Sequence, residues 1–360
     1  MVLAVTVAVF LKSSGIGFKN PGLPSQTGSQ QQISIDATAS EIALDTREHA
    51  LICVYHGDIV ECTLDAVNGI NGDGTVKWTI PVTMSSPFVK ISESDLLVAD
   101  SGGRYLCCIN DGRKKWELTV QGPIINADIS DKGYAAIVQE VPGYKCRVSV
   151  VDPSGAEVFN RSFAENYVLQ ALPAASGRYL IVNSIDASGL FSVSNLEFFN
   201  MKGDPFSALI PEKDKVYPYT FMLSGDNTVS VGDNGIVLYD SERKEKWRKD
   251  SLNIGSVTAL AGKYIVIASI VTSGHSATQL TSLDMKGENA FNLTLEGRMT
   301  GLRSFGTIIA AFGDRDVYFI SSTGRIISKY TCRTMIKDVL FIDRTQVVIV
   351  TQGRLFIIKI

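Results

Sequence analysis

The sequence repeats one short motif seven times, a tight turn followed by a strand that in six of the copies carries a large aromatic residue. In the clearest copy, Asp111–Gly112–Arg113–Lys114–Lys115–Trp116, the glycine precedes the tryptophan by four positions. The seven copies are centred on Gly74, Gly112, Gly155, Gly203, Arg243, Gly287 and Gly324. Their spacing is 37 to 48 residues. A period of about 42 residues is typical of propeller or solenoid arrays, in which each repeat is one supersecondary unit.

The aromatic position of the motif predicts contacts between successive repeats. It holds Trp78, Trp116, Phe159, Phe206, Trp247 and Phe291, and thus all three tryptophans of the chain. The seventh copy has no aromatic residue there. Glycine tolerates the positive φ of a tight turn, and Asp or Asn caps it. An aromatic ring that projects from the following strand onto the next repeat would bury about 200 Å². We therefore assign these residues architectural roles.

Each repeat also contains three short apolar runs before the motif, separated by Gly, Asp, Asn and Ser. In the third repeat the four predicted strands are Ile124–Ile129, Tyr134–Val138, Tyr144–Val151 and Glu157–Phe163. The runs are rich in β-branched and aromatic residues, and they lack helical periodicity. Four-stranded units of about 42 residues are β-propeller blades, so we predict an all-β propeller of four-stranded antiparallel blades.

The two ends of the chain predict how the ring closes. Three strands follow the last motif, at 336–342, 346–351 and 354–360, which is one strand short of a blade. The alternating run at 32–37 is a strand with no partner nearby. We predict that it completes the C-terminal blade and removes the exposed sheet edges. This makes eight blades, and seven is the alternative if one strand set is decorative. The predicted blades are 41–82, 83–120, 121–164, 165–210, 211–250, 251–296, 297–331, and 332–360 with 32–37.

The most apolar runs are predicted to be second strands, covered on both faces by neighbouring blades. They are Leu51–Val54, Leu180–Val182, Ile265–Ala268 and Val347–Val350. The innermost strands would line the axial channel, where Lys90 and Asp128 are the exceptional charges. The longest blade, the fourth, has a Ser-, Gly- and Asp-rich insert around Ser184–Ser194, which we predict as a binding edge.

The N-terminus predicts a membrane or export segment at 1–11, a flexible linker at 12–31 and the propeller at 32–360. Residues 1–11 are apolar apart from Thr6, and a polar tract follows. A helix of that length rises only about 16 Å, against a hydrocarbon core of about 30 Å. We expect the end of an anchor or signal segment that starts upstream of Met1. A frayed terminus or a strand stacked on the propeller are the alternatives.

No residue pattern indicates catalysis, a cofactor or a metal. His49, His56 and His275 are too scattered for a zinc site. The vicinal pair Cys107–Cys108 falls within a regular strand, where consecutive side chains point to opposite faces. The 34 basic and 37 acidic residues form no basic stripe, which argues against nucleic acid.

One pair of cysteines is a candidate disulfide. If His56–Gly57–Asp58–Ile59 is a two-residue hairpin, Cys53 lies opposite Cys62 in a non-hydrogen-bonded pair, with their side chains closest. A cross-strand bridge is then one interpretation for an extracellular protein. Two buried thiols that act as small apolar groups are the other.

The repeat resembles the tryptophan-docking repeat of the pyrroloquinoline-quinone (PQQ)-type propellers. The resemblance covers about residues 32–360 and is most specific in Leu64–Trp78, Cys108–Trp116 and Val237–Trp247. It lacks the Trp-Asp pairs of WD40 blades and the Gly-Gly pairs of kelch blades. Within this superfamily the chain is most similar to PQQ-like propeller proteins of Firmicutes that carry a membrane segment before the propeller. The resemblance implies eight blades and an extracytoplasmic setting, and it implies no enzyme activity.

From these observations we expect a monomeric, non-catalytic scaffold that binds another envelope protein and is tethered to the cell membrane, or is secreted. A small-ligand receptor or an enzyme with a site in the axial channel is the alternative function, because propellers can place sites there. An intracellular interaction propeller is a third possibility, and it requires residues 1–11 to be soluble.

Overall fold

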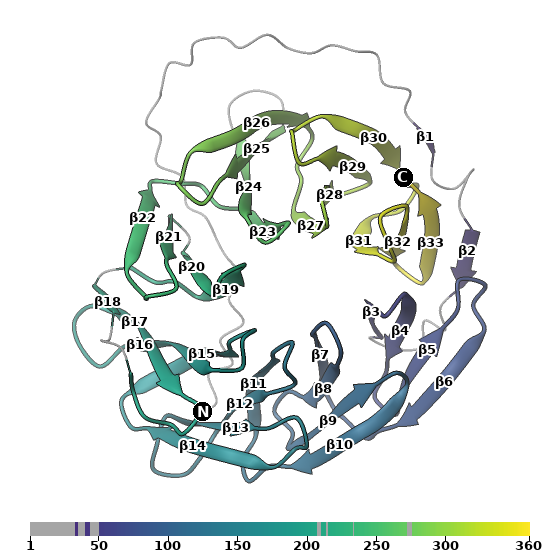
Figure 1. The fold of residues 1–360 in the computed structure, drawn as a ribbon. Coiled ribbons are helices and arrows are strands. Elements are labelled where there is room, and N and C mark those ends of the chain that lie inside the picture. The colour runs from purple at the N-terminus through teal and green to yellow at the C-terminus, as the bar shows by residue number, and fades with distance from the viewer. Residues whose placement is uncertain are drawn as a thin grey trace.

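The chain forms a closed ring of eight four-stranded antiparallel blades around a central axis (Figure 1). The computed structural model describes residues 33–34, 40–43, 50–206, 210–213, 215–232, 234–271 and 276–360. The predicted anchor at 1–11 and linker at 12–31 fall outside these residues. The described residues contain no helix that is long and apolar enough to cross a membrane. The predicted fold class and the count of eight blades are confirmed.

Each blade places its four strands in order from the axis to the rim. The innermost strands are β3 (Leu51–Tyr55), β7 (Pro87–Ile91), β11 (Ile124–Ile129), β15 (Asn166–Pro173), β19 (Tyr219–Leu223), β23 (Ser256–Leu260), β27 (Gly301–Phe305) and β31 (Ile336–Phe341). The second strands are β4 (Asp58–Cys62), β8 (Leu96–Asp100), β12 (Ala135–Gln139), β16 (Tyr179–Asp186), β20 (Asn227–Val231), β24 (Tyr264–Val271), β28 (Ile308–Gly313) and β32 (Gln346–Thr351).

The third and outer strands complete the blades. The third strands are β5 (Ala66–Ile70), β9 (Tyr105–Asn110), β13 (Cys146–Val151), β17 (Val193–Asn200), β21 (Gly235–Tyr239), β25 (Ala277–Leu283), β29 (Asp316–Ser321) and β33 (Arg354–Lys359). The outer strands are β6 (Val76–Pro81), β10 (Arg113–Thr119), β14 (Glu157–Phe163), β18 (Ile210–Lys213), β22 (Glu245–Asp250), β26 (Asn289–Glu296), β30 (Ile326–Thr331) and β2 (Ser40–Ala43).

An N-terminal strand closes the ring, but its position differs from the prediction. The outer strand of the last blade is β2, which pairs antiparallel with β33. Within the predicted segment 32–37, the described residues Ile33–Ser34 form β1, which pairs in parallel with β30 of the seventh blade. The first blade therefore starts at β3, whereas the predicted boundary was residue 41. For the same reason Leu51–Val54 belongs to an innermost strand, whereas the sequence had predicted a second strand.

The core lies between adjacent blades and is formed mainly by the second and third strands. Every residue of β8 and β12 is buried, because each of these strands is covered on both faces by a neighbouring blade. Cys107 and Cys108 show the geometry. Cys107 packs between the first and second blades and Cys108 between the second and third, so consecutive side chains of β9 enter different cores.

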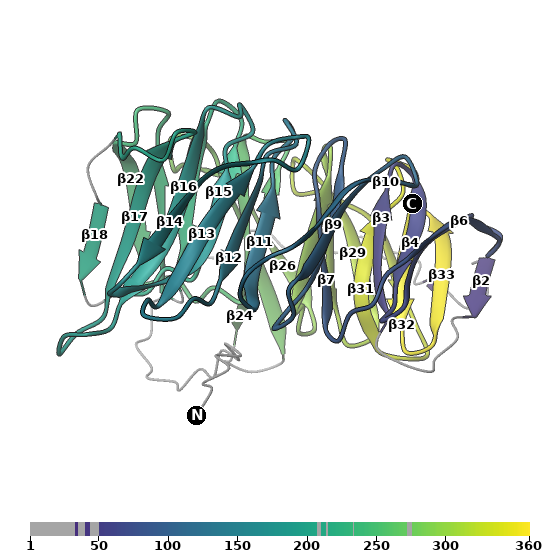
Figure 2. The same cartoon turned by 90° about the horizontal axis from the view of Figure 1, so that it is seen from below.

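The two faces of the ring carry different connections. One face carries the connections between consecutive blades and the hairpins between second and third strands, and we call it the inter-blade face. It is the lower side in Figure 2. We call the other side the turn face, because it carries the turns between first and second strands and between third and outer strands. The repeated sequence motif lies on the turn face.

Candidate interaction face

Five turn glycines of the motif lie directly against the aromatic residue of the preceding blade. The pairs are Trp78 with Gly112, Trp116 with Gly155, Phe159 with Gly203, Trp247 with Gly287, and Phe291 with Gly324. A Cβ atom on Gly155 would stand 2.8 Å from Cγ of Trp116, and Gly155 has a φ of +85°. Glycine is thus required twice, for the backbone conformation and for the space that the ring occupies.

Asp and Asn residues cap these turns as the motif suggested. In the third blade, Oδ1 of Asp152 accepts hydrogen bonds from the backbone N–H groups of Ser154 at 2.8 Å and Ala156 at 3.1 Å. The same pair of bonds is made by Asn200, Asp240 and Asp284. These residues hold the turn in the conformation against which the aromatic side chain of the preceding blade packs.

Two junctions between blades lack the pairing of a glycine with an aromatic ring, and different residues make the contact there. In the fifth blade Arg243 replaces the glycine, keeps a positive φ of +65°, and places its guanidinium carbon 4.2 Å from the ring centroid of Phe206. At the closure, Ile42 of β2 contacts the position of Gly74. The seventh blade has Ser328 at the aromatic position. Its neighbour, the eighth blade, takes β2 from the far end of the chain, so no third-to-outer turn exists there to receive a ring.

The candidate disulfide rested on a register that the structure does not have. The turn is centred on His56 and Gly57, whose φ values are +50° and +81°, and Tyr55 pairs with Asp58. Cys53 therefore lies opposite Val60, and Cys62 opposite Leu51. Both thiols are free and buried, and burial raises the pKa of each to about 12. The predicted direct pairing of Cys53 with Cys62 is wrong.

Among the histidines, His56 joins the first two blades on the turn face. Its Nδ1 lies 2.8 Å from Oδ1 of Asp111 and its Nε2 2.9 Å from the carbonyl oxygen of Glu93, while its ring stacks on Tyr55. The hydrogen bond to Glu93 and the Asp111 carboxylate raise the pKa of His56. His49 and His275 lie outside the described residues. No group of three metal-ligating side chains occurs in the described part of the chain.

The axial channel contains more charge than the sequence suggested, and these charges pair across neighbouring blades. Lys90 Nζ lies 3.1 Å from Asp128 Oδ2, as the two exceptional residues meet between β7 and β11. Arg303 and Asp338, which sequence reasoning missed, form the corresponding pair between β27 and β31 at 2.9 Å. Desolvation raises the pKa of Asp128, and Lys90 opposes that effect. These pairs support blade contacts and leave both carboxylates with a cationic partner.

Exposed apolar side chains gather on the inter-blade face of the third, fourth and fifth blades. We call this set the apolar surface; it comprises Ile125, Tyr144, Tyr167, Leu190, Phe191 and Val216. Leu190 is 91% exposed, more than any other large hydrophobic residue described, and Phe191 beside it is 50% exposed. The innermost strands of these three blades contact one another in sequence. Contiguous exposed apolar side chains mark interaction sites, and Leu190 with Phe191 is the adjacent pair in this set.

The fourth blade projects the most exposed part of the apolar surface. Its second and third strands, β16 and β17, have eight residues each, and the loop between them carries Leu190 and Phe191. This loop lies within the insert predicted as a binding edge. The sequence signal was a pair of large apolar residues, flanked by Gly189 and Ser192, within a polar loop that offers no core to bury them.

A contact between the third and fourth blades holds Tyr167 of this surface. Lys145, at the base of the β12–β13 loop, donates from Nζ to the hydroxyl of Tyr167 at 3.1 Å and lies 4.8 Å from its ring centroid. Tyr144 is adjacent and 50% exposed. The lysine holds two neighbouring blades together, so part of the surface is preorganised for binding.

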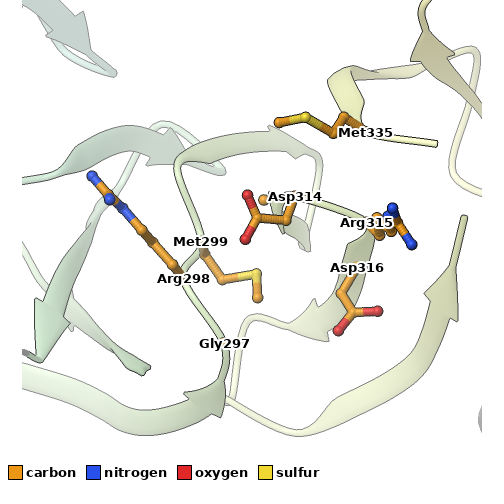
Figure 3. Close-up of a pocket in the computed structure, with 8 residues that line it drawn as sticks. Gly297, Arg298, Met299, Asp314, Arg315, Asp316 and Met335 are labelled. Atoms are coloured by element: carbon orange, nitrogen blue, oxygen red, sulfur yellow. The ribbon is translucent and has the colours of Figure 1, made fainter. Parts of the chain in front are cut away.

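A hollow of about 380 Å³ opens on the same face of the sixth to eighth blades (Figure 3). It is lined by Gly297, Arg298, Met299, Gly313, Asp314, Arg315, Asp316 and Met335. Met299 is buried and Met335 is 64% exposed. Asp316 is held by Lys329 at 3.3 Å. The hollow joins the apolar side chains of Met299 and Met335 with the charged groups of Arg298, Asp314, Arg315 and Asp316.

Comparison with known proteins identifies the family and the fold. The model of the family described as "Family of unknown function (DUF5711)" matches residues 30–360, so the chain belongs to that family. A search of curated proteins gives no sequence match.

Several solved structures share the propeller. BamB from Moraxella catarrhalis superposes with a TM-score of 0.59 at 15% identity, over 90% of this chain and 99% of that one. The C-terminal WD40 domain of Sif2 gives a TM-score of 0.66 at 11% identity, over 92% and 99%. The dihydro-heme d1 dehydrogenase NirN gives 0.56 at 13% identity, over 89% and 75%. Identities this low establish the fold alone.

Proposed function

We propose that this propeller is a non-catalytic scaffold that binds another protein through its inter-blade face, in an extracytoplasmic position at the bacterial cell envelope. The observation that carries the proposal is the apolar surface, with Leu190 at 91% exposure at the tip of the longest hairpin. The likeness to BamB and to WD40 domains fits a scaffold role. Tyr167 is held by Lys145 of the neighbouring blade, so little conformational entropy is lost there on association.

The envelope setting rests on the sequence of residues 1–11 and on the resemblance to membrane-tethered propellers. It is tested by cell fractionation and by protease treatment of intact cells that carry the full chain. We expect the propeller to sediment with membranes and to be cleaved from outside. A chain that remains in the cytosolic fraction and is protected would refute this part of the proposal.

The scaffold role is tested by comparing variants of the tagged full chain in gently solubilised envelopes. We expect a partner at stoichiometric yield with the wild type and its loss from the double variant Leu190→Asp and Phe191→Asp. Val76→Asp is the matched control, because Val76 is 57% exposed but lies on β6 beside the turn face. The proposal fails if wild type and double variant retain the same proteins.

A further inference from the structure

The wall of the axial channel is accessible to solvent. Every residue of the innermost strand β7 is partly or fully exposed, whereas every residue of its neighbour β8 is buried. Each innermost strand is the edge of its sheet, and large apolar side chains on four of them keep much of their surface exposed (Figure 1). They are Leu51 at 37%, Ile91 at 43%, Tyr219 at 47% and Phe305 at 42%. The channel is therefore an accessible space with apolar groups in its wall.

Tyr219 points into this channel from the fifth blade. Desolvation raises the pKa of its hydroxyl although the side chain is 47% exposed, as expected for a group in an opening that protein surrounds. The charges of Lys90, Asp128 and Arg303, on the second, third and seventh blades, also act on this hydroxyl. Among the described residues the hydroxyl has no hydrogen-bond partner. Charged groups from three blades thus surround a tyrosine that is free to bind a ligand.

The two carboxylates of the channel are engaged by the propeller itself. Asp128 accepts a hydrogen bond from Lys90 Nζ at 3.1 Å on Oδ2, and one from the backbone N–H of the following residue at 2.9 Å on Oδ1. Asp338 repeats this arrangement with Arg303 at 2.9 Å and with the following N–H at 2.8 Å. Each carboxylate therefore binds a cation and also caps the inner edge of its sheet.

The cations of these two pairs keep unused donors. An ammonium group has three N–H donors and a guanidinium five. Within the described residues, Lys90 makes one hydrogen bond, to its aspartate, and Arg303 makes two, to its aspartate and to a backbone carbonyl. Together with the hydroxyl of Tyr219, the channel thus offers several free donors, which suit a ligand that accepts hydrogen bonds.

Lys337 adds a third cation at the inter-blade end of the channel. It lies in the innermost strand β31 at a β-bulge, where the pairing with β32 passes from Ile336 to Asp338. A bulged residue is unpaired, and bulges re-aim side chains. Lys337 is exposed and, in the part of the chain that the structure describes, has no ion-pair partner. The eight innermost strands thus carry three cations and two carboxylates, an excess of one positive charge.

The connections that lead into the innermost strands do not reverse this balance. In their described parts, Arg298 and Arg333 stand against one carboxylate, that of Glu165. Lys215, in the same set of connections, is paired with Asp250 at 2.7 Å. The inter-blade end of the channel is therefore the end that attracts an anion.

We propose that the axial channel binds a small amphiphilic anion, a molecule with an apolar body and one carboxylate. The carboxylate would accept hydrogen bonds from Tyr219 and Arg303 and pair with Lys337. The apolar body would lie against Ile91 and Phe305, which end their strands toward the turn face. Ligand pockets commonly combine apolar walls with a few polar groups that fix orientation. The inference does not depend on the proposed scaffold function, because it uses none of the residues of the apolar surface.

Calorimetric titration of the complete chain with octanoate, 1-octanol and octylamine tests the ligand class. The three probes share an apolar chain and differ in the headgroup. We expect octanoate to bind at one site per chain, with an affinity at least about tenfold above those of the other two, because hydrogen bonds to a charged group are the stronger ones. Equal affinities would overturn the preference for an anion. The absence of saturable octanoate binding would overturn the proposal.

Two substitutions then locate the site. Lys337→Met and Tyr219→Phe keep the size of the side chain and remove the ammonium or the hydroxyl. Each should weaken octanoate binding about three- to fivefold, the loss expected for one exposed ion pair or one neutral hydrogen bond. Lys337→Met should also reduce the dependence on salt. The matched controls, Lys246→Met on the outer strand β22 and Tyr144→Phe in the β12–β13 loop, should bind as the wild type does.

The double variant Leu190→Asp and Phe191→Asp separates the channel from the apolar surface. We expect it to bind octanoate with unchanged affinity. If it loses octanoate while Lys337→Met and Tyr219→Phe retain it, the probe binds at the apolar surface and the channel site is wrong. Failure to capture a protein partner would refute the scaffold function alone, because the titration contains no partner.

Discussion

The contact between a turn glycine and the aromatic ring of the preceding blade makes a quantitative prediction at Gly155. Substitution by alanine has two costs there. The first is the left-handed backbone, with φ at +85°, which costs an L-residue about 1–2 kcal/mol. The second is overlap with Trp116, because the new Cβ would lie 2.8 Å from Cγ and 3.0 Å from Cβ of that side chain. Such overpacking costs about 1–3 kcal/mol.

Gly143 separates these two costs. Its φ is +82°, but no atom lies within 4 Å of the place where its Cβ would be. Gly143→Ala should therefore lower the free energy of unfolding by the backbone cost alone, about 1–2 kcal/mol. Gly155→Ala should lower it by about 2–5 kcal/mol, the sum of the backbone and overpacking costs. Urea unfolding followed by circular dichroism measures both, and the slope with denaturant should stay the same.

A double-mutant cycle with Trp116 then tests the assigned contact. Trp116 is 8% exposed, and Trp116→Ala alone should cost about 3–5 kcal/mol. In that background Gly155→Ala should cost no more than Gly143→Ala, because the ring that it strikes is gone. The coupling energy should thus be about 1–3 kcal/mol. Equal effects of the two glycine substitutions, or a coupling near zero, would refute the proposed docking of blade on blade.

Three further outcomes follow. Arg243→Ala should be less stable than Arg243→Gly by about 1 kcal/mol in urea unfolding, because both lose the contact with Phe206 but only glycine relieves the positive φ; the reverse order would contradict this reasoning. Because the folded-state pKa of His56 is raised, its stabilising contribution is complete below the unfolded value of about 6.5 and is lost as pH rises through the folded value. Wild type should therefore lose stability relative to His56→Gln between about pH 6 and 8, by less than about 1 kcal/mol at this exposed site. If the free energies of unfolding of the two proteins change in parallel with pH, the contact of His56 with Asp111 and Glu93 does not stabilise the fold. Cys53 and Cys62 should both be alkylated after unfolding without reductant, since diagonal positions across a strand pair lie about 7–8 Å apart, beyond the reach of a disulfide, and a bridged peptide in mass spectrometry would show otherwise.

The propeller architecture was predictable because short sequence motifs that repeat along the chain specify its turns and strands. A glycine or Asx turn followed by an aromatic residue recurs at a regular spacing, and each copy needs only a few neighbouring residues to specify its turn. The apolar runs between the copies have strand lengths and no helical period. Blade number, strand order and the docking of Trp116 toward the next blade therefore followed from the sequence.

Register and closure depended on contacts between distant segments. The strand that completes the last blade is Ser40–Ala43, and no hairpin ties it to its partner β33 at the other end of the chain. The run at 32–37 alternates as a closing strand would, and residues from 41 onward were predicted to belong to the first blade. The hairpin at His56 shifted because a non-glycine residue adopts positive φ, which the local sequence does not signal.

The sequence by itself determined the repeating unit, and with it the fold, because strand alternation, turn chemistry and the aromatic position act over a few residues. Tertiary structure alone decided which surface is available for binding. Leu190 and Tyr144 lie far apart in the chain, and the packing of the fourth blade on the third brings their two hairpin loops to the same face of the ring. The tertiary structure also explains why Ser328 occupies the aromatic position. The eighth blade, which would receive an aromatic side chain from the seventh, is completed by a strand from the opposite end of the chain.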